Sequence, residues 1–74
     1  NVTLVDSKTR LQEYSLKRYR KLPTYKLISS KGPKHDLVFK ISVKLYDTKE
    51  FIGSGNSKKN AEQNAAEKLL NNIA

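Results

Sequence analysis

The sequence predicts an α+β domain in which two helices pack on one face of a three-stranded antiparallel sheet. Two stretches, residues 7–19 and 58–72, contain good helix formers and neither Gly nor Pro. Between them the apolar pattern changes from a period of about 3.6 residues to a period of two, which is typical of strands. Because the strands form one run flanked by helices, the predicted order is α-β-β-β-α.

Residues 7–19 are expected to form the first helix. Asp6 precedes them as an N-cap, and Pro23 prevents the helix from extending much further. One side of this helix is expected to face the core, with Leu11, Tyr14, Ser15 and the stem of Arg18, and the opposite side carries Thr9, Gln12, Glu13 and Leu16. Residues 1–5 show no clear period and are interpreted as a linker remnant, so the domain is expected to span residues 6–74.

The first two strands are expected in residues 24–30 and 37–46. Ile28 breaks the alternation of the first. The second alternates cleanly between an apolar set, Phe39, Ile41, Val43 and Leu45, and a polar set that should face water, Lys40, Ser42, Lys44 and Tyr46. This pattern predicts a sheet with one buried face and one wet face.

A third strand and a second helix complete the expected order. The strand covers residues 50–55, and the pattern leaves open whether Phe51 or Ile52 points inward. Ser57 is the predicted N-cap of the helix. The apolar residues of this helix are Ala61, Ala65, Ala66, Leu69, Leu70 and Ile73. Because the alanines come first, the start of the helix is expected to approach the sheet closely.

Composition limits the functions that are open to this chain. It has 74 residues, 15 Lys and Arg against seven Asp and Glu, a formal net charge of +8, one histidine and no cysteine. One histidine without cysteine makes no zinc site, and a chain this small is not expected to enclose a pocket for a small-molecule substrate. The positive charge favours a polyanionic partner. No apolar run approaches the roughly 18 residues of a membrane span, and we expect a cytoplasmic protein.

Several stretches of the chain together resemble the double-stranded RNA-binding domain. They are KTRLQEY, LPTY, GPKH, Phe39 followed by alternating aliphatic residues, and GSGNSKKNAEQNAAEKLL. Their order and spacing are similar to those of the family over essentially the whole chain. The resemblance is closest to the carboxy-terminal domain of bacterial ribonuclease III, in which a glutamate commonly occupies the position of Glu62.

Three polar clusters are the candidate RNA-binding residues. We define the helix cluster as Thr9, Gln12 and Glu13, the loop cluster as Pro33, Lys34 and His35, and the lysine cluster as Ser57, Lys58 and Lys59. Two lysines at a helix start oppose the helix dipole unless an anion binds there, which favours phosphate contacts. Gln12 and Glu13 offer acceptors for ribose 2′-hydroxyls in the minor groove of A-form RNA.

The resemblance assigns further roles to these clusters. It implies that the helix cluster enters one minor groove and that Pro33 and His35 enter the next, with Lys34 near the backbone. It also implies that Lys58 and Lys59 reach the phosphates across the major groove. The family has a further lysine where this chain has Glu62, so that contact is in doubt.

The function expected from the residues and the resemblance together is binding of double-stranded RNA by shape, with little dependence on sequence. The resemblance implies a parent ribonuclease III, a homodimer through a catalytic domain that uses Mg²⁺ and precedes Asn1. The scattered carboxylates of this chain form no catalytic centre of that kind. Three alternatives remain: a protein-interaction domain of the same fold, a structural RNA-binding protein, and a true nuclease.

Overall fold

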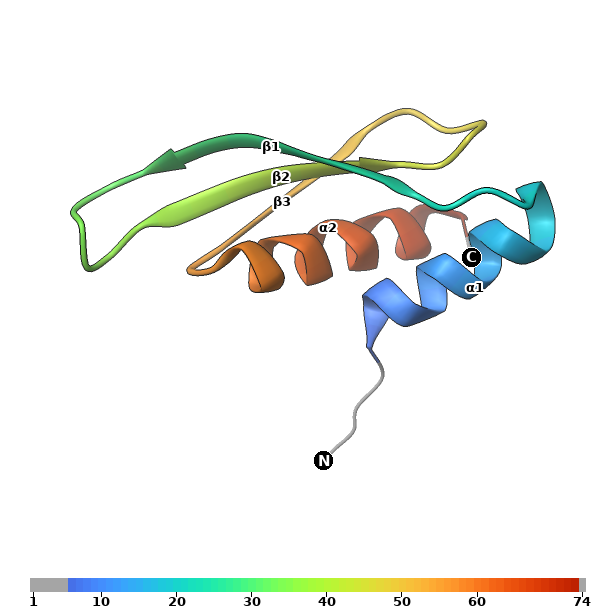
Figure 1. Cartoon of the computed structure of the whole chain (residues 1–74), viewed down its shortest axis with the longest axis horizontal. Coiled ribbons are helices and arrows are strands. Elements are labelled where there is room, and N and C mark those ends of the chain that lie inside the picture. The colour runs from blue at the N-terminus through green and yellow to red at the C-terminus, as the bar shows by residue number, and fades with distance from the viewer. Residues whose placement is uncertain (1–5, 74) are drawn as a thin grey trace.

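The computed structural model of the chain describes residues 6–73, and the expected linker remnant at residues 1–5 lies outside this range. The elements are α1 (Ser7–Tyr19), β1 (Thr24–Lys31), β2 (Val38–Lys44), β3 (Phe51–Gly55) and α2 (Lys58–Ile73). The strands form one antiparallel sheet in the order β1-β2-β3. Both helices lie on the same side of this sheet (Figure 1). The predicted α-β-β-β-α architecture is therefore confirmed.

The first helix begins and ends at the residues that its local chemistry selects. The Asp6 carboxylate accepts hydrogen bonds from the backbone amides of Lys8 (3.1 Å) and Thr9 (3.5 Å), as expected of an N-cap. Arg20 ends the helix in the left-handed conformation, with φ at 59°, and its amide donates to the Leu16 carbonyl. A left-handed residue stops the helix three positions before Pro23.

The core side of α1 is narrower than the sequence suggested. Leu11 and Ser15 are buried, and Tyr14 is half-buried. The placement of Arg18 on the core side was wrong, because this residue is exposed. Tyr19 packs against the core instead, and the Arg18 guanidinium lies 5.7 Å from the centre of the Tyr19 ring. Ser15 is tolerated in the core because its hydroxyl donates to the carbonyl of Lys21.

The break in alternation at Ile28 is a β-bulge. Leu27 pairs with Ile41 and Ser29 pairs with Lys40, so Ile28 is an extra residue with no partner in β2. The residues before and after the bulge therefore keep their faces. Tyr25 and Leu27 share the helix-facing side with Val43 and Ile41, and the residues between them point away.

The registers also settle the orientation of β3. Phe51 pairs with Val43, which is fully buried, and Gly53 pairs with Ile41, so Phe51 points inward and Ile52 outward. The prediction that Ser42 faces water was wrong, because only 2% of this residue is exposed. Ser42 does lie on the outer face, but β2 is the central strand, and the larger side chains of Lys26 and Ile52 flank it on both sides.

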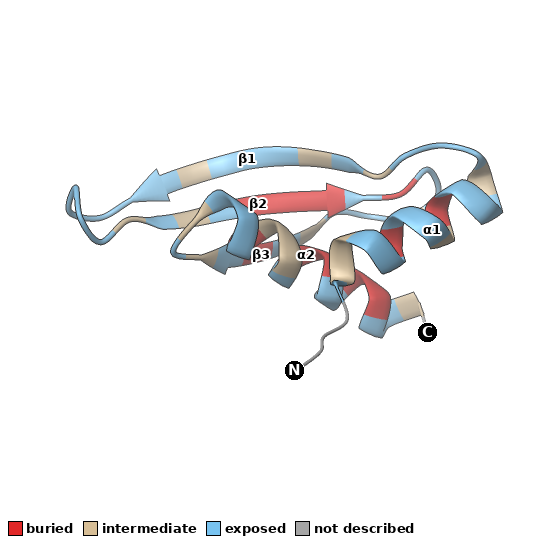
Figure 2. Cartoon of the chain, turned by 60° about the horizontal axis from the view of Figure 1, so that its bottom comes forward, coloured by how far each residue is buried: buried red, intermediate tan, exposed pale blue. Residues whose placement is uncertain are grey.

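The second helix provides most of the packing against the sheet. Its small residues meet β3 at Gly53, where an added Cβ would lie 2.2 Å from the Ala65 amide nitrogen and 2.7 Å from the Ala61 carbonyl oxygen. The buried core joins both helices to β2 and the residue after it: Leu11, Val43, Leu45, Ala65, Ala66, Leu69 and Leu70. Buried residues accordingly gather where α2 and β2 face each other (Figure 2). The predicted close approach of the alanines to the sheet is confirmed.

Candidate nucleic-acid interface

The helix cluster lies on the solvent side of α1. Thr9, Gln12 and Glu13 are all exposed. They occupy the first two turns of the helix, next to the Asp6 cap. A hydrogen bond from the Gln63 side chain, followed by weaker ones from Thr9 and Lys8, lowers the pKa of the Asp6 carboxyl. The start of α1 thus carries an ionised cap beside exposed polar side chains that can donate and accept hydrogen bonds.

The loop cluster lies in the connection between β1 and β2. Gly32 has φ at +116°, a value that residues with a Cβ rarely adopt, and it turns the chain out of β1. A tight turn follows, in which the Asp36 amide donates to the Pro33 carbonyl at 2.9 Å. Pro33, Lys34 and His35 are all exposed. The loop therefore presents the predicted residues to solvent on a constrained turn.

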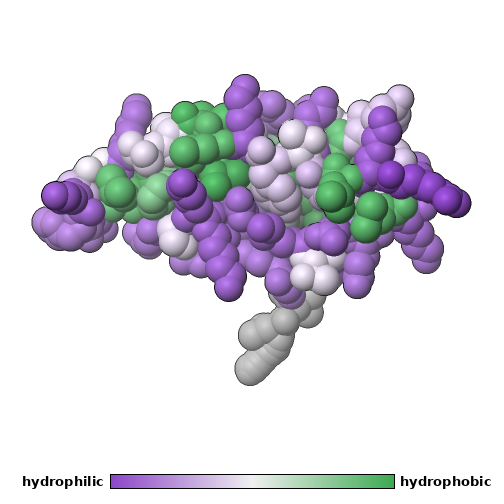
Figure 3. All heavy atoms as spheres, in the orientation of Figure 1, coloured by the Kyte–Doolittle hydropathy of each residue, from purple (hydrophilic) through white to green (hydrophobic). Residues whose placement is uncertain are grey.

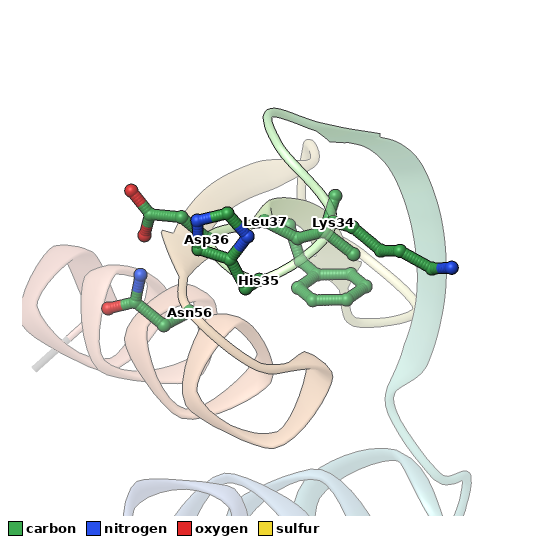
Figure 4. Close-up of a pocket in the computed structure, with 6 residues that line it drawn as sticks. Lys34, His35, Asp36, Leu37 and Asn56 are labelled. Carbon is green, nitrogen blue, oxygen red and sulfur yellow. The ribbon is translucent and has the colours of Figure 1, made fainter.

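A hollow of about 410 Å³ lies beside this loop. Its lining comprises Lys34, His35, Asp36, Leu37, Phe39 and Asn56. Figure 4 shows His35 and Asp36 on the side of the hollow that faces Asn56, whereas the Lys34 side chain extends in the opposite direction. Because Asn56 immediately precedes Ser57, the hollow brings the loop cluster next to the start of α2. Sequence reasoning did not single out Asn56.

The lysine cluster lies at the amino end of α2. The Ser57 hydroxyl accepts a hydrogen bond from the Asn60 amide at 3.0 Å, and the Ser57 carbonyl accepts one from the Ala61 amide. This confirms Ser57 as the N-cap. Within the described residues, the amides of Lys58 and Lys59 have no such partner, as expected at a helix start.

The charge at this helix start is entirely positive. Lys58 and Lys59 are exposed, and the first turn of α2 contains no acidic residue. The partial positive charge of the helix end adds to that of the two ammonium groups. This combination of open amides, helix dipole and lysines suits the binding of a phosphate group.

Contacts between the two helices hold the start of α1 against α2. The Lys8 ammonium lies 2.6 Å from the Glu62 carboxylate, and the Lys8 backbone amide donates to the Gln63 side chain at 3.2 Å. The Gln63 amide group in turn donates to the Asp6 carboxylate. Lys8 also lies 5.2 Å from the centre of the Tyr25 ring. These contacts join α1, α2 and β1 at one point.

Glu62 is therefore committed to a partner within the domain. A lysine at this position would contact phosphate in the family. In this chain the Glu62 carboxylate instead forms a salt bridge with Lys8. Lys8 and Gln63 were not singled out by sequence reasoning. Lys8 and Glu62 are 54 positions apart, so no local spacing could have indicated the pair.

Two further findings concern other kinds of site. Nowhere in residues 6–73 do three or more His, Cys, Asp or Glu side chains gather closely enough to hold a metal ion. Over the same residues, neither helix is long and apolar enough to cross a membrane.

Comparison with protein families and solved structures gives consistent matches. A family model described as the double-stranded RNA binding motif matches residues 7–73. The solution structure of DRB4 dsRBD2 superimposes with a TM-score of 0.65 at 32% sequence identity, over 93% of this chain and 96% of that one.

Two curated relatives are much longer proteins. The chain is 57% identical over 72 residues to Ribonuclease 3 of Pelagibacter ubique (strain HTCC1062), and the matched segment covers 97% of this chain and 32% of the relative. It is 52% identical over 68 residues to Ribonuclease 3 of Leptospira interrogans (serovar Lai, strain 56601), which covers 92% of this chain and 28% of the relative. The chain thus spans about a third of the length of these relatives.

Proposed function

The chain belongs to the double-stranded RNA-binding domain family, and we propose that it binds an A-form RNA duplex by shape, with little dependence on base sequence. In this proposal the helix cluster and the loop cluster enter two successive minor grooves. The lysine cluster contacts the phosphates between them. Domains of this kind span roughly 16 base pairs.

The observation that carries the proposal is the start of α2. Lys58 and Lys59 are exposed there beside open backbone amides, with no acidic residue in the first turn. An isolated helix would be less stable with this charge arrangement, because both lysines oppose its dipole. A bound phosphate reverses the balance, since it satisfies the amides and neutralises the lysines together.

The helix cluster supplies the preference for RNA. A carboxylate near a polyanion costs binding energy, so Glu13 needs a favourable partner on the duplex. The ribose 2′-hydroxyl is such a partner, because it can donate to the Glu13 carboxylate, while Gln12 can both donate and accept. DNA lacks this hydroxyl, and we expect it to bind more weakly on this side of the domain.

The parent protein is proposed to be a ribonuclease III. Support comes from the relatives named Ribonuclease 3, of which this chain matches about a third. In that setting the domain binds the duplex, and a catalytic domain elsewhere in the parent cleaves it with Mg²⁺. The parent is proposed to be a homodimer through its catalytic domain and to act in the cytoplasm. This chain would contribute affinity and position rather than catalytic groups.

A competition gel shift tests the proposal. A labelled RNA duplex of roughly 20 base pairs, which exceeds one footprint, is bound to the domain. It is then challenged with unlabelled RNA and DNA duplexes of the same sequence, and with an unlabelled RNA duplex of unrelated sequence. We expect the RNA competitor, even with an unrelated sequence, to displace the label at much lower concentration than the DNA. Equal displacement by RNA and DNA would refute recognition of the A-form duplex.

A further inference from the structure

The face of the sheet that points away from the helices carries lysines that the proposed RNA contacts do not use. The pairing registers place alternate residues of each strand on this outer face. It displays four exposed lysines, Lys26, Lys31, Lys40 and Lys44. No Asp or Glu occurs in the three strands, although Glu50 immediately precedes β3, and within residues 6–73 none of the four lysines forms a salt bridge. In Figure 3 hydrophilic side chains project along the sheet side of the molecule, at the top, among hydrophobic areas; the outer face also exposes Val38 and Ile52.

Three of these lysines are close neighbours. Lys26 pairs with Ser42, which places it diagonally between Lys40 and Lys44 on the adjacent strand. Diagonal neighbours on one face of a sheet are separated by about 7–8 Å, which is within reach of long side chains. Like charges at this spacing repel one another. The arrangement therefore disfavours the free domain slightly and favours the binding of an anion.

Protection of sheet edges does not account for the whole set. Lysines on edge strands commonly prevent unwanted strand pairing. This reason applies to Lys26 and Lys31, because β1 is an edge strand. It does not apply to Lys40 and Lys44, because β2 is the central strand and is paired on both sides.

We propose that this outer face is a second nucleic-acid surface, which binds the phosphodiester backbone of a second duplex. Its charge is complementary to a polyanion, and the exposed hydroxyls of Thr24 and Ser54 add hydrogen-bond donors for phosphate oxygens. Because both helices lie on the opposite side of the sheet (Figure 1), a straight duplex seated on α1 and the start of α2 does not reach it. The second surface goes beyond the proposed function, since it binds a different molecule with different residues.

The two surfaces differ in what they recognise. Lysine contacts phosphate as a point charge and carries no information about sequence or sugar. The outer face therefore binds RNA and DNA duplexes alike, whereas the helix side prefers RNA. If three lysines of the outer face each contact one phosphate of a DNA duplex, raising the salt from about 50 to about 200 mM should weaken binding at this face by roughly 40-fold.

Amide chemical-shift mapping by NMR at low salt separates the two binding events. The probe is an RNA duplex of roughly one footprint, about 16 base pairs, added first to one equivalent and then in excess, with a DNA duplex of equal length in a parallel titration. We expect the first equivalent of RNA to shift the amides of α1, the loop cluster and the start of α2. Excess RNA, and DNA, should then shift the outer-face residues of β1 and β2.

Two triple variants with equal loss of charge test the assignment. The sheet variant is Lys26→Gln, Lys40→Gln and Lys44→Gln, and the control variant is Lys21→Gln, Lys49→Gln and Lys68→Gln, three exposed lysines outside the strands and the three clusters. The sheet variant should bind DNA at least about tenfold more weakly, and the binding of excess RNA at the strands should weaken by the same factor. The affinities of the control variant should stay close to those of the parent domain.

The proposal is overturned if excess duplex shifts no strand amides in the parent domain, or if both variants weaken the second event equally. The latter result would mean that net charge alone is responsible. Failure of the proposed function appears separately in the same spectra, as missing shifts on α1, the loop and the start of α2 at the first equivalent of RNA.

Discussion

The Lys8 ammonium on α1 lies 2.6 Å from the Glu62 carboxylate on α2, in the only salt bridge within residues 6–73. Around it, the Lys8 amide and the Asp6 carboxylate both bind the side chain of Gln63. These contacts fix the start of α1 beside the first turns of α2. They thereby set the spacing between the helix cluster and the lysine cluster, which in the proposed function matches the spacing of grooves and phosphates on a duplex.

A double-mutant cycle with Lys8→Ala and Glu62→Ala measures this pair. The two side chains are 37% and 26% exposed, so water and salt screen the attraction. We expect a coupling free energy of unfolding of about 0.2–1 kcal/mol, which decreases as salt rises. Urea denaturation of the four proteins at low and high salt gives the value. Strictly additive effects at low salt would contradict a stabilising pair.

Gly53→Ala tests the close approach of β3 to α2. An added methyl group would collide with backbone atoms of Ala61 and Ala65, which cannot rotate away as a side chain would. We expect the free energy of unfolding to fall by about 1–3 kcal/mol or more, as for overpacking in a core. Ser54→Ala, at the adjacent exposed position, is the control and should change stability by less than about 0.5 kcal/mol. Similar losses for the two variants would argue against the contact.

Tyr25→Phe removes a buried hydroxyl that has no hydrogen-bond partner within the described residues. Such a group carries a desolvation cost with no compensating bond. We therefore expect the variant to be as stable as the parent at neutral pH, or more stable by about 1 kcal/mol. Chemical denaturation measures the difference, and a clear loss of stability would show that the hydroxyl has a partner in solution.

The difference in stability between the parent and Tyr25→Phe is also expected to change at alkaline pH. Burial, and then the negative charges of Glu62 and Asp6, raises the pKa of Tyr25 to about 12, against an ordinary value of 10.0. Because the folded state holds the proton more tightly, the associated stability is present below pH 10 and is lost as the pH rises toward 12. The difference in stability between the parent and Tyr25→Phe should shift in favour of the variant over this interval. A difference independent of pH would contradict the raised pKa.

The elements could be predicted from the sequence because their signals are local. The caps at Asp6 and Ser57 act over three or four residues, and the alternation from Phe39 to Leu45 indicates the two faces of β2 and of the residue after it. The pattern also marked Ile28 as irregular. Its identity as a bulge required the register of β1 against β2, which the sequence of one strand does not contain.

The sequence-based predictions were wrong or incomplete where residues far apart in the sequence determine the burial or orientation of a side chain. Ser42 is buried because of its neighbours on β1 and β3, and Phe51 points inward because Gly53, two residues later, must face α2. At the candidate interface, the pairing of Lys8 with Glu62 joins residues 54 positions apart. The three clusters themselves could be found from the sequence, since each lies within a single helix or loop, and their roles toward RNA stay predictions.

Replacing Lys58 and Lys59 by alanine tests the proposed phosphate contacts most directly. Each phosphate contact contributes about 1–1.5 kcal/mol, so loss of both contacts should lower the affinity for an RNA duplex roughly 30- to 150-fold. Because phosphates carry no sequence information, unrelated duplexes should lose affinity by similar factors, and the dependence on salt should become shallower by about two units of slope.

Lys21→Ala with Lys49→Ala removes the same charge away from the three clusters and serves as the control. Quantitative gel shifts over a range of salt concentrations measure all of these quantities. A loss confined to one duplex sequence would indicate base readout, and an equal loss in the control would reduce the role of α2 to net charge; either result would remove the start of this helix as the element that engages the backbone.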